Sequence, residues 1–149
     1  MPRPTFWLLL LACAVAPPAD AQSDEQAVLA VVKRLFDGMR TRDTGLMRAQ
    51  MDPTARLIGI DSTGAHALEP GRWIGAVGRM TGEGADERTF DPEVRVDGNI
   101  ATVWTYYELW RGSTLSHCGI DAFFLVKTLG GWKVSQVADT RRSPCQPRR

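Results

Sequence analysis

The sequence has few of the residues that bind metals or act as nucleophiles. Its 149 residues include three cysteines and two histidines, and no Cys-x-x-Cys pair occurs. This composition fits neither a zinc site nor thioredoxin-like redox chemistry. A glycine-rich phosphate loop and covalent flavin or haem attachment motifs are also missing from the sequence. We therefore expect neither a metal nor a cofactor.

An excess of charge of one sign is also lacking. The formal net charge is +1, with 18 Lys and Arg against 17 Asp and Glu, and no long basic stripe is present. This balance argues against nucleic-acid binding. Long apolar runs are scarce as well. Phe6 to Ala16 is about 11 residues long, whereas a helix needs about 20 to span a bilayer.

The first 21 residues have the three parts of a signal peptide. Arg3 gives a short positive start, the apolar run follows, and Ala19-Asp20-Ala21 is a small-x-small cleavage site. The pattern predicts cleavage after Ala21 and a periplasmic or secreted protein without membrane contact after cleavage. A membrane anchor and lipoprotein processing at Cys13 remain as alternatives. We expect a signal peptide at 1–21, one domain at 22–142 and a C-terminal tail at 143–149.

Hydrophobic spacing predicts helices in the first half of the domain. An apolar stripe from Val28 to Met39 follows a capping residue at Ser23 or Asp24, which is typical of an amphipathic helix. The further elements expected are a helix at 44–50, a strand at 55–61, a loop at 62–69 and a helix from Pro70 to Met80.

The second half changes to alternating, β-branched and aromatic residues. It predicts strands at 89–96, 100–111, 115–128 and 132–139, joined by short turns that contain glycine. Helices followed by a meander indicate an α+β domain, with three N-terminal helices packed on a curved antiparallel sheet.

Strand alternation also predicts which side chains face the core. In the last strand, Trp132, Val134 and Gln136 are expected to point inward, while Asp139 and Arg141 form an exposed pair. A two-residue turn at Gly130-Gly131 then sets the register of the preceding strand. Its expected inward residues are His117, Gly119, Asp121, Phe123 and Leu125.

An inward Asp121 and His117 give this core a polar end. A buried carboxyl and an imidazole suit a general acid and base, and they equally suit a structural hydrogen-bond pair. Tyr107 joins them on the inner face, or Tyr106 replaces it there, depending on the length of the turn between Arg111 and Thr114. Both alternatives stay open at this point.

The same register places Cys118 on the outer face, opposite Ser143 and close to Cys145. An even number of cysteines in an oxidising compartment favours a Cys118–Cys145 disulfide over two free thiols. The remaining outer face is apolar, so we expect a second copy of the chain to cover it in a homodimer. It consists of Ile120, Ala122, Phe124 and Val126.

The chain resembles the NTF2-like superfamily in its order of elements and in three segments. These segments are Ser116-His117-Cys118-Gly119-Ile120-Asp121, Gly131-Trp132-Lys133-Val134 and Ala138-Asp139-Thr140-Arg141-Arg142. This superfamily includes ketosteroid isomerases, SnoaL-type cyclases and scytalone dehydratase, and the match is to a bacterial secreted subgroup labelled putative lumazine-binding. The resemblance implies a conical domain with an apolar pocket between helices and sheet, often dimeric through the sheet. The isomerases place a Tyr near the end of the first helix, whereas this chain has Phe36 to Met39 there.

Three functional hypotheses follow. The first is binding of a small, partly apolar molecule in the conical pocket. The second is a cofactor-independent acid–base lyase or isomerase that uses Asp121 and His117, and the third is a dimeric interaction module whose cone is filled by its own side chains. The residues expected to bind a ligand are Trp73, Tyr107, Phe123, Leu125, Trp132 and Gln136.

Overall fold

A computed structural model of the chain describes residues 19–82, 84–145 and 147. Residues 1–18 of the predicted signal peptide, including Cys13, lie outside this part of the chain. Within the described part, no helix is long and apolar enough to cross a membrane.

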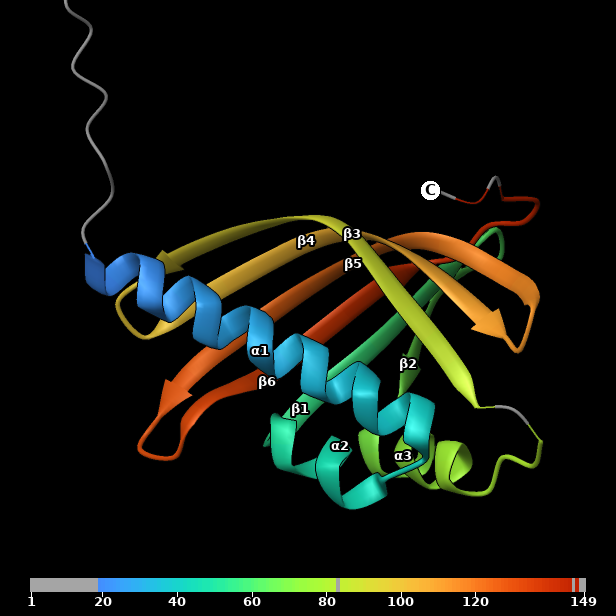
Figure 1. Ribbon diagram of the computed structural model, residues 1–149, viewed down its shortest axis with the longest axis horizontal. Helices are drawn as coiled ribbons and strands as arrows, with labels where there is room; N and C mark the ends of the chain where they lie inside the picture. The colour runs from blue at the N-terminus through green and yellow to red at the C-terminus, as the bar shows by residue number, and fades with distance from the viewer. Residues whose placement is uncertain (1–18, 83, 146, 148–149) are drawn as a thin grey trace, which may run out of the picture.

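Three helices pack against one six-stranded sheet (Figure 1), which confirms the α+β prediction. The strand order is β2-β1-β6-β5-β4-β3. The helices are α1 (Ala19–Thr41), α2 (Thr44–Gln50) and α3 (Pro70–Gly78), and the strands are β1 (Met51–Asp61), β2 (Gly64–Leu68), β3 (Ala85–Asp97), β4 (Ile100–Arg111), β5 (Thr114–Thr128) and β6 (Gly131–Thr140).

The sheet is mixed, and the prediction of a purely antiparallel sheet was wrong. β1 runs parallel to β6, with Leu57 opposite Val137 and Gly59 opposite Asp139. The segment expected to be a loop contains β2, which pairs antiparallel with β1 across a tight turn where Asp61 lies opposite Gly64. These two strands extend the meander of β3 to β6.

Helix α1 buries the predicted apolar stripe, including Val28, Leu35 and Met39, against the sheet. The two short helices begin at side-chain caps. Asp43 accepts a hydrogen bond from the backbone N–H of Leu46 over 2.8 Å, and Glu69 accepts from the first backbone N–H groups of α3. Figure 1 shows α1 lying across the sheet, with α2 and α3 gathered at one end.

A β-bulge at Ser135 changes the face of the second half of β6. Phe124 lies opposite Gln136, whereas the next residue, Leu125, lies opposite Val134. Trp132 and Val134 point into the core as predicted, but beyond the bulge the alternation is reversed. Val137, Asp139 and Arg141 therefore face inward, and the predicted inward position of Gln136 was wrong.

A second irregularity, at Ser116, settles the face of Tyr107. The turn pairs Arg111 with Thr114, which by itself would turn Tyr107 outward. The pairing then shifts by one residue, so that Tyr107 lies opposite Gly119. Tyr107 is 1% exposed and points inward, and Tyr106 takes the other face.

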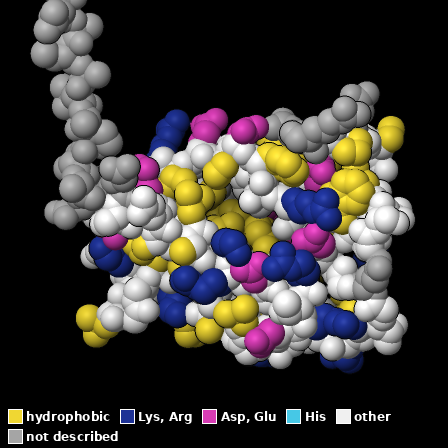
Figure 2. Space-filling model, in the orientation of Figure 1, with side chains coloured by type: hydrophobic (Ala, Val, Ile, Leu, Met, Phe, Trp, Pro, Cys, Tyr) yellow, Lys and Arg dark blue, Asp and Glu magenta, His cyan; other side chains and the backbone are white. Residues whose placement is uncertain are grey.

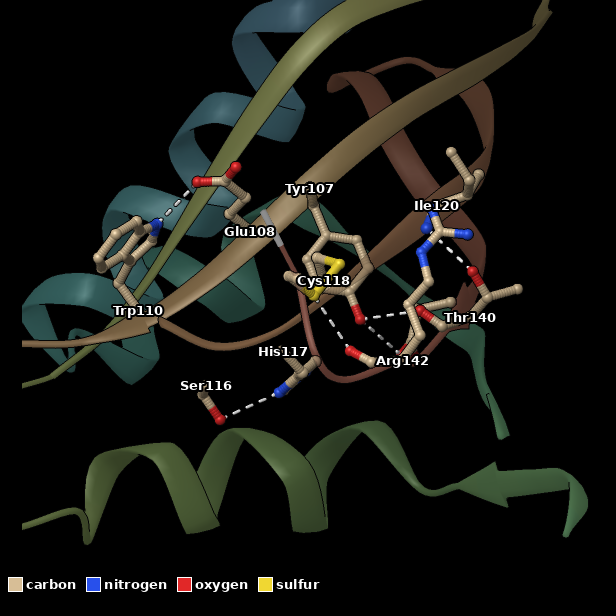
Figure 3. The surroundings of a disulfide bond; sticks show 11 residues. Tyr107, Glu108, Trp110, Ser116, His117, Cys118, Ile120, Thr140 and Arg142 are labelled. Atoms are coloured by element: carbon tan, nitrogen blue, oxygen red, sulfur yellow. Dashed lines mark hydrogen bonds between the residues drawn. A yellow bond between two sulfur atoms is a disulfide. The ribbon is translucent and has the colours of Figure 1, made fainter. Parts of the chain in front are cut away.

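The predicted disulfide joins Cys118 and Cys145, with 6.0 Å between their Cα atoms (Figure 3). Arg142, not Ser143, pairs with Cys118. The turn lies at Leu129-Gly130, where Thr128 pairs with Gly131, so the prediction of a turn at Gly130-Gly131 was wrong by two residues of register, and the bulge at Ser135 moves the register back by one. The backbone N–H of each residue donates to the carbonyl oxygen of the other, over 3.2 and 3.0 Å. The disulfide holds the tail against β5 directly after the last strand.

Candidate functional site

A cavity of about 370 Å³ lies between the helices and the inner face of the sheet. Its walls are mainly apolar and include the aromatic side chains of Phe36, Trp73 and Phe123. The cone is therefore not filled by its own side chains, which contradicts the hypothesis of an interaction module with a filled cone.

The inner end of this cavity contains two hydrogen-bonded carboxyl groups, Glu87 on β3 and Asp121 on β5. Asp121 is 1% exposed, and its Oδ2 atom has no hydrogen-bond partner among the residues that the structure describes. A buried polar atom without a partner is unusual in native proteins. The orphan oxygen marks this end of the cavity as a place for a ligand atom.

Both carboxyl groups of this pair hold protons more tightly than ordinary acids. Removal from water raises the pKa of Glu87 to about 7, with the charge of Asp139 adding to the effect and the hydrogen bond from Asp121 opposing it. Burial, and then the negative charge of Glu87, raises the pKa of Asp121 well above its usual range. The pair therefore holds at least one proton near neutral pH.

Asp139 and Arg141 form an ion pair beside the carboxyl pair. The Arg141 Nε atom lies 2.6 Å from Asp139 Oδ2, and its Nη2 atom lies 3.4 Å from Oδ1. Both residues line the cavity, so the expectation that the pair points outward was wrong, although the Arg141 side chain is 45% exposed as an exposed pair requires. The bulge at Ser135 is the reason, since it turns this end of β6 inward.

Tyr107 connects the inner face of β4 to the end of β6. Its hydroxyl donates to the carbonyl oxygen of Thr140 over 3.0 Å and lies 3.5 Å from Asp139 Oδ2. Burial, together with the neighbouring acids, raises the pKa of Tyr107, so the hydroxyl stays protonated and remains a donor. Figure 3 shows the ring reaching toward Thr140.

His117 lines the same cavity at a different point. Its ring packs edge-on against Tyr107, with 5.8 Å between ring centroids, and its Nδ1 atom lies 3.2 Å from Ser116 Oγ (Figure 3). Burial, followed by the positive charge of Arg141, lowers the pKa of His117. The imidazole is therefore neutral at neutral pH. The side chain hydrogen-bonded to Asp121 is Glu87, not His117.

The predicted ligand-binding residues divide into three groups. Trp73, Tyr107 and Phe123 line the cavity. Leu125 and Trp132 pack in the hydrophobic core instead. Gln136 lies opposite Phe124, on the outer face.

Glu87 is the site residue that the sequence did not reveal. We expected β3 to begin at residue 89, which left Asp86-Glu87-Arg88 as a charged connecting segment. The strand begins at Ala85, which is 3% exposed, and Glu87 follows two positions later on the same face. That alternation from a buried alanine is the signal by which Glu87 could have been found.

A second hollow, of about 470 Å³, lies between α1 and β3. It shares Phe36 and Glu87 with the first cavity, so Glu87 lies between the two. Figure 2 shows hydrophobic side chains at the centre of this face, surrounded by charged ones. Apart from Glu87, the charged groups along the second hollow form ion pairs, which are Lys33–Asp37, Arg40–Asp37, Arg40–Asp86 and Arg88–Asp86.

Metal binding has no evident site in the part of the chain that the structure covers. No group of three or more His, Cys, Asp or Glu side chains is arranged there to hold a metal ion. The chemistry that the described cavity offers is therefore that of its carboxyl groups, its tyrosine hydroxyl and its aromatic walls.

Comparison with known families gives one match that covers most of the chain. Residues 23–137 match the family described as "Putative lumazine-binding". No curated protein matches the sequence.

Solved structures with the same fold come from several bacteria. An NTF2-like protein of unknown function from Shewanella baltica has a TM-score of 0.69 and 14% identity, covering 87% of this chain and all of the other. An NTF2-like protein with a cystatin-like fold from Novosphingobium aromaticivorans has a TM-score of 0.70 and 11% identity, covering 83% and 85%. One from Cytophaga hutchinsonii has a TM-score of 0.63 and 17% identity, covering 78% and 97%. These similarities show that the fold is NTF2-like.

Proposed function

Because the chain belongs to the "Putative lumazine-binding" family, we propose that it binds a small, partly apolar molecule in its cavity. The observation that carries this proposal is the carboxyl group of Asp121, buried at the cavity wall with its Oδ2 atom unpartnered among the described residues. Leaving a buried polar atom unpaired costs about 1–3 kcal/mol. A ligand with a hydrogen-bond donor would recover that cost.

The size and walls of the cavity fit the same function. Its volume of about 370 Å³ is within the roughly 300–1,000 Å³ common for small-molecule sites. The rings of Phe36, Trp73 and Phe123 give a flat molecule apolar surfaces on which to pack. The family description makes lumazine, a flat heterocycle, the first candidate to test.

The direct test is titration of the purified protein with lumazine, followed by calorimetry or by the fluorescence of the ligand. We expect saturable binding to the wild type and at least tenfold weaker binding to Asp121→Asn. Asp97→Asn, an exposed position at the end of β3, is the matched control and should bind like the wild type. Absence of saturable binding by lumazine and by a small-fragment library would contradict the proposed function.

An acid–base lyase or isomerase is the second candidate function. The observation that favours it is the pKa of about 7 at Glu87, since a group that titrates near the working pH is suited to proton transfer. The geometry gives Asp121 the partner Glu87 in place of His117. Turnover of any bound molecule should fall at least a hundredfold in Asp121→Asn, and equal turnover by both proteins would exclude this chemistry.

A homodimer through the outer sheet face remains part of the proposal. Large apolar side chains are exposed there, with Trp104 at 54%, Phe124 at 44% and Ile100 at 46%. Apolar surface of this kind on a sheet is typical of an interface. Sedimentation analysis should find a dimer that Trp104→Lys with Phe124→Lys dissociates, and a monomeric wild type would refute the proposal.

The last part of the proposal is that the protein is exported to the periplasm or secreted. The Cys118–Cys145 disulfide supports it, because such bonds persist in oxidising compartments. Intact-mass analysis of the protein recovered from the producing cell should give a chain that starts at Gln22. A cytoplasmic chain that retains Met1 would contradict the proposal.

A further inference from the structure

Acidic groups outnumber basic groups around the Glu87–Asp121 pair in the cavity. Glu87 on β3, Asp121 on β5 and Asp139 on β6 approach one guanidinium group, that of Arg141. Two nitrogen atoms of Arg141 contact Asp139, so these two residues neutralise each other. The Glu87–Asp121 pair is left with a proton in place of a cation.

The other polar groups around the cavity do not supply the missing positive charge. Tyr107 from β4 stays neutral and donates to Thr140, and His117 from β5 is neutral because burial lowers its pKa. From α3, Glu69 caps its own helix. Arg72 and Arg111 also line the cavity, where the charge of Arg111 acts on His117, and the cation whose charge acts on both members of the pair is Arg141.

We infer that the ligand of this cavity carries a cationic nitrogen, an ammonium or amidinium group, which binds between Glu87 and Asp121. Its N–H would donate to Asp121 Oδ2, the oxygen atom without a partner among the described residues. Its charge would neutralise the carboxylate pair, as buried charges require. The apolar remainder of the ligand would pack against Phe36 and Trp73. This inference rests on the proposed function and names the chemical class of its ligand.

Binding of a cation at this position exchanges one positive charge for another. The free pair holds a proton, and an arriving ammonium or amidinium group takes its place, so a proton is released to solvent. Glu87 lines both the cavity and the second hollow beside α1. Affinity for a cation should therefore rise with pH, whereas a neutral molecule displaces no proton.

The test compares two probes of the same shape, benzamidine, which is a cation, and benzamide, which is neutral. Calorimetry with the full-length mature protein is run at pH 6 and pH 8, in two buffers of different ionisation enthalpy. We expect benzamidine to bind at least tenfold more tightly than benzamide at pH 8. We also expect at least a threefold gain in its affinity from pH 6 to pH 8, and proton release on binding.

Two variants assign this preference to the acid pair. Glu87→Gln and Asp121→Asn should each reduce the ratio of benzamidine to benzamide affinity to within about threefold of unity. Glu93→Gln, an exposed position on the same strand as Glu87, should leave the ratio unchanged. Circular dichroism checks that each variant folds. If one variant does not fold, the affinity ratio of the wild type still shows whether the cavity prefers a cation.

The outcomes separate the ligand class from the function itself. If benzamide binds as tightly as benzamidine and no proton is released, the inference of a cationic ligand is refuted, while the proposed binding function is retained. Binding of lumazine while benzamidine does not bind has the same meaning. If none of the three compounds and no member of the fragment library binds, both the ligand class and the proposed function fail.

Discussion

Gly119 and Tyr107 lie directly opposite each other on β5 and β4, and the hydrogen atom that serves as the side chain of Gly119 leaves the room that the tyrosine needs. A Cβ atom at position 119 would lie 1.7 Å from the carbonyl oxygen of Thr140 and 2.9 Å from Cε1 of Tyr107. The Tyr107 hydroxyl reaches that same carbonyl oxygen, over 3.0 Å. Close packing of three strands therefore depends on this one glycine.

Gly119→Ala should destabilise the domain by about 3 kcal/mol or more, since the added methyl group meets backbone on one side and a buried ring on the other. Urea unfolding measures the effect. Gly130→Ala is the matched control, because its nearest neighbour is a side-chain atom 3.7 Å away. Equal stability of the two variants would show that the strands have room to separate.

Tyr107→Phe should lower the free energy of unfolding by about 1–2 kcal/mol, because the Thr140 carbonyl oxygen loses its hydroxyl donor while the ring contacts remain. Urea unfolding again gives the value. The edge-on packing of the ring on His117 is retained in this variant, so the His117 titration followed by NMR should move little. A stability equal to the wild type would mean that the hydroxyl contributes nothing.

The carboxyl pair should make stability fall as pH rises from about 4 to about 7. In this window the folded chain holds protons on Glu87 and Asp121 that the unfolded chain has lost, because their folded pKa values are raised. Stability decreases wherever the folded state binds more protons. The rise of the Glu87 pKa from 4.5 to about 7 alone corresponds to about 3 kcal/mol.

Chemical unfolding of the wild type and Asp121→Asn at pH 5 and pH 8 tests this dependence. We expect a smaller loss of stability with rising pH in the variant, which removes one of the two acids. His117 acts in the opposite direction in both proteins, because its lowered pKa adds stability as pH rises through about 6.5, so the comparison cancels it. Identical pH profiles would contradict the raised pKa values.

Reduction of the Cys118–Cys145 disulfide should cost about 3–4 kcal/mol, the chain-entropy value for a bridge between residues 27 positions apart. Unfolding with and without dithiothreitol measures it. The Cys118→Ser, Cys145→Ser double variant should match the reduced wild type and should not respond to dithiothreitol. If reduction leaves the wild type as stable as before, the disulfide does not stabilise the domain by constraining the unfolded chain.

Regular elements were predictable from the sequence, because their signals are local. The helix expected at 44–50 and the strand expected at 100–111, with its β-branched and aromatic residues, have the bounds of α2 and β4 in the structure. The disulfide was also predicted. What the sequence did not show was the pairing of β1 with β6, which depends on how the helices direct the chain.

The site was harder to predict, because side-chain faces depend on register. Ser116 and Ser135 each shift the pairing by one residue, and a serine within a strand carries no local signal for a bulge. The first shift placed Tyr107 inward, and the second brought Asp139 and Arg141 to the cavity. Asp121 was placed correctly because the bulge at Ser135 lies on β6, so the alternation of β5 continues without interruption from Leu125 through Phe123 to Asp121.

The bulge at Ser135 gives the two halves of β6 opposite alternations. Before the bulge, Trp132 and Val134 face the core, and beyond it Asp139 and Arg141 face the cavity. If all residues of β6 paired regularly with β5, Gln136, Ala138 and Thr140 would face the cavity, and Asp139 and Arg141 would turn outward together. The ion pair at the cavity therefore depends on an irregularity of the backbone as well as on the two residues that form it.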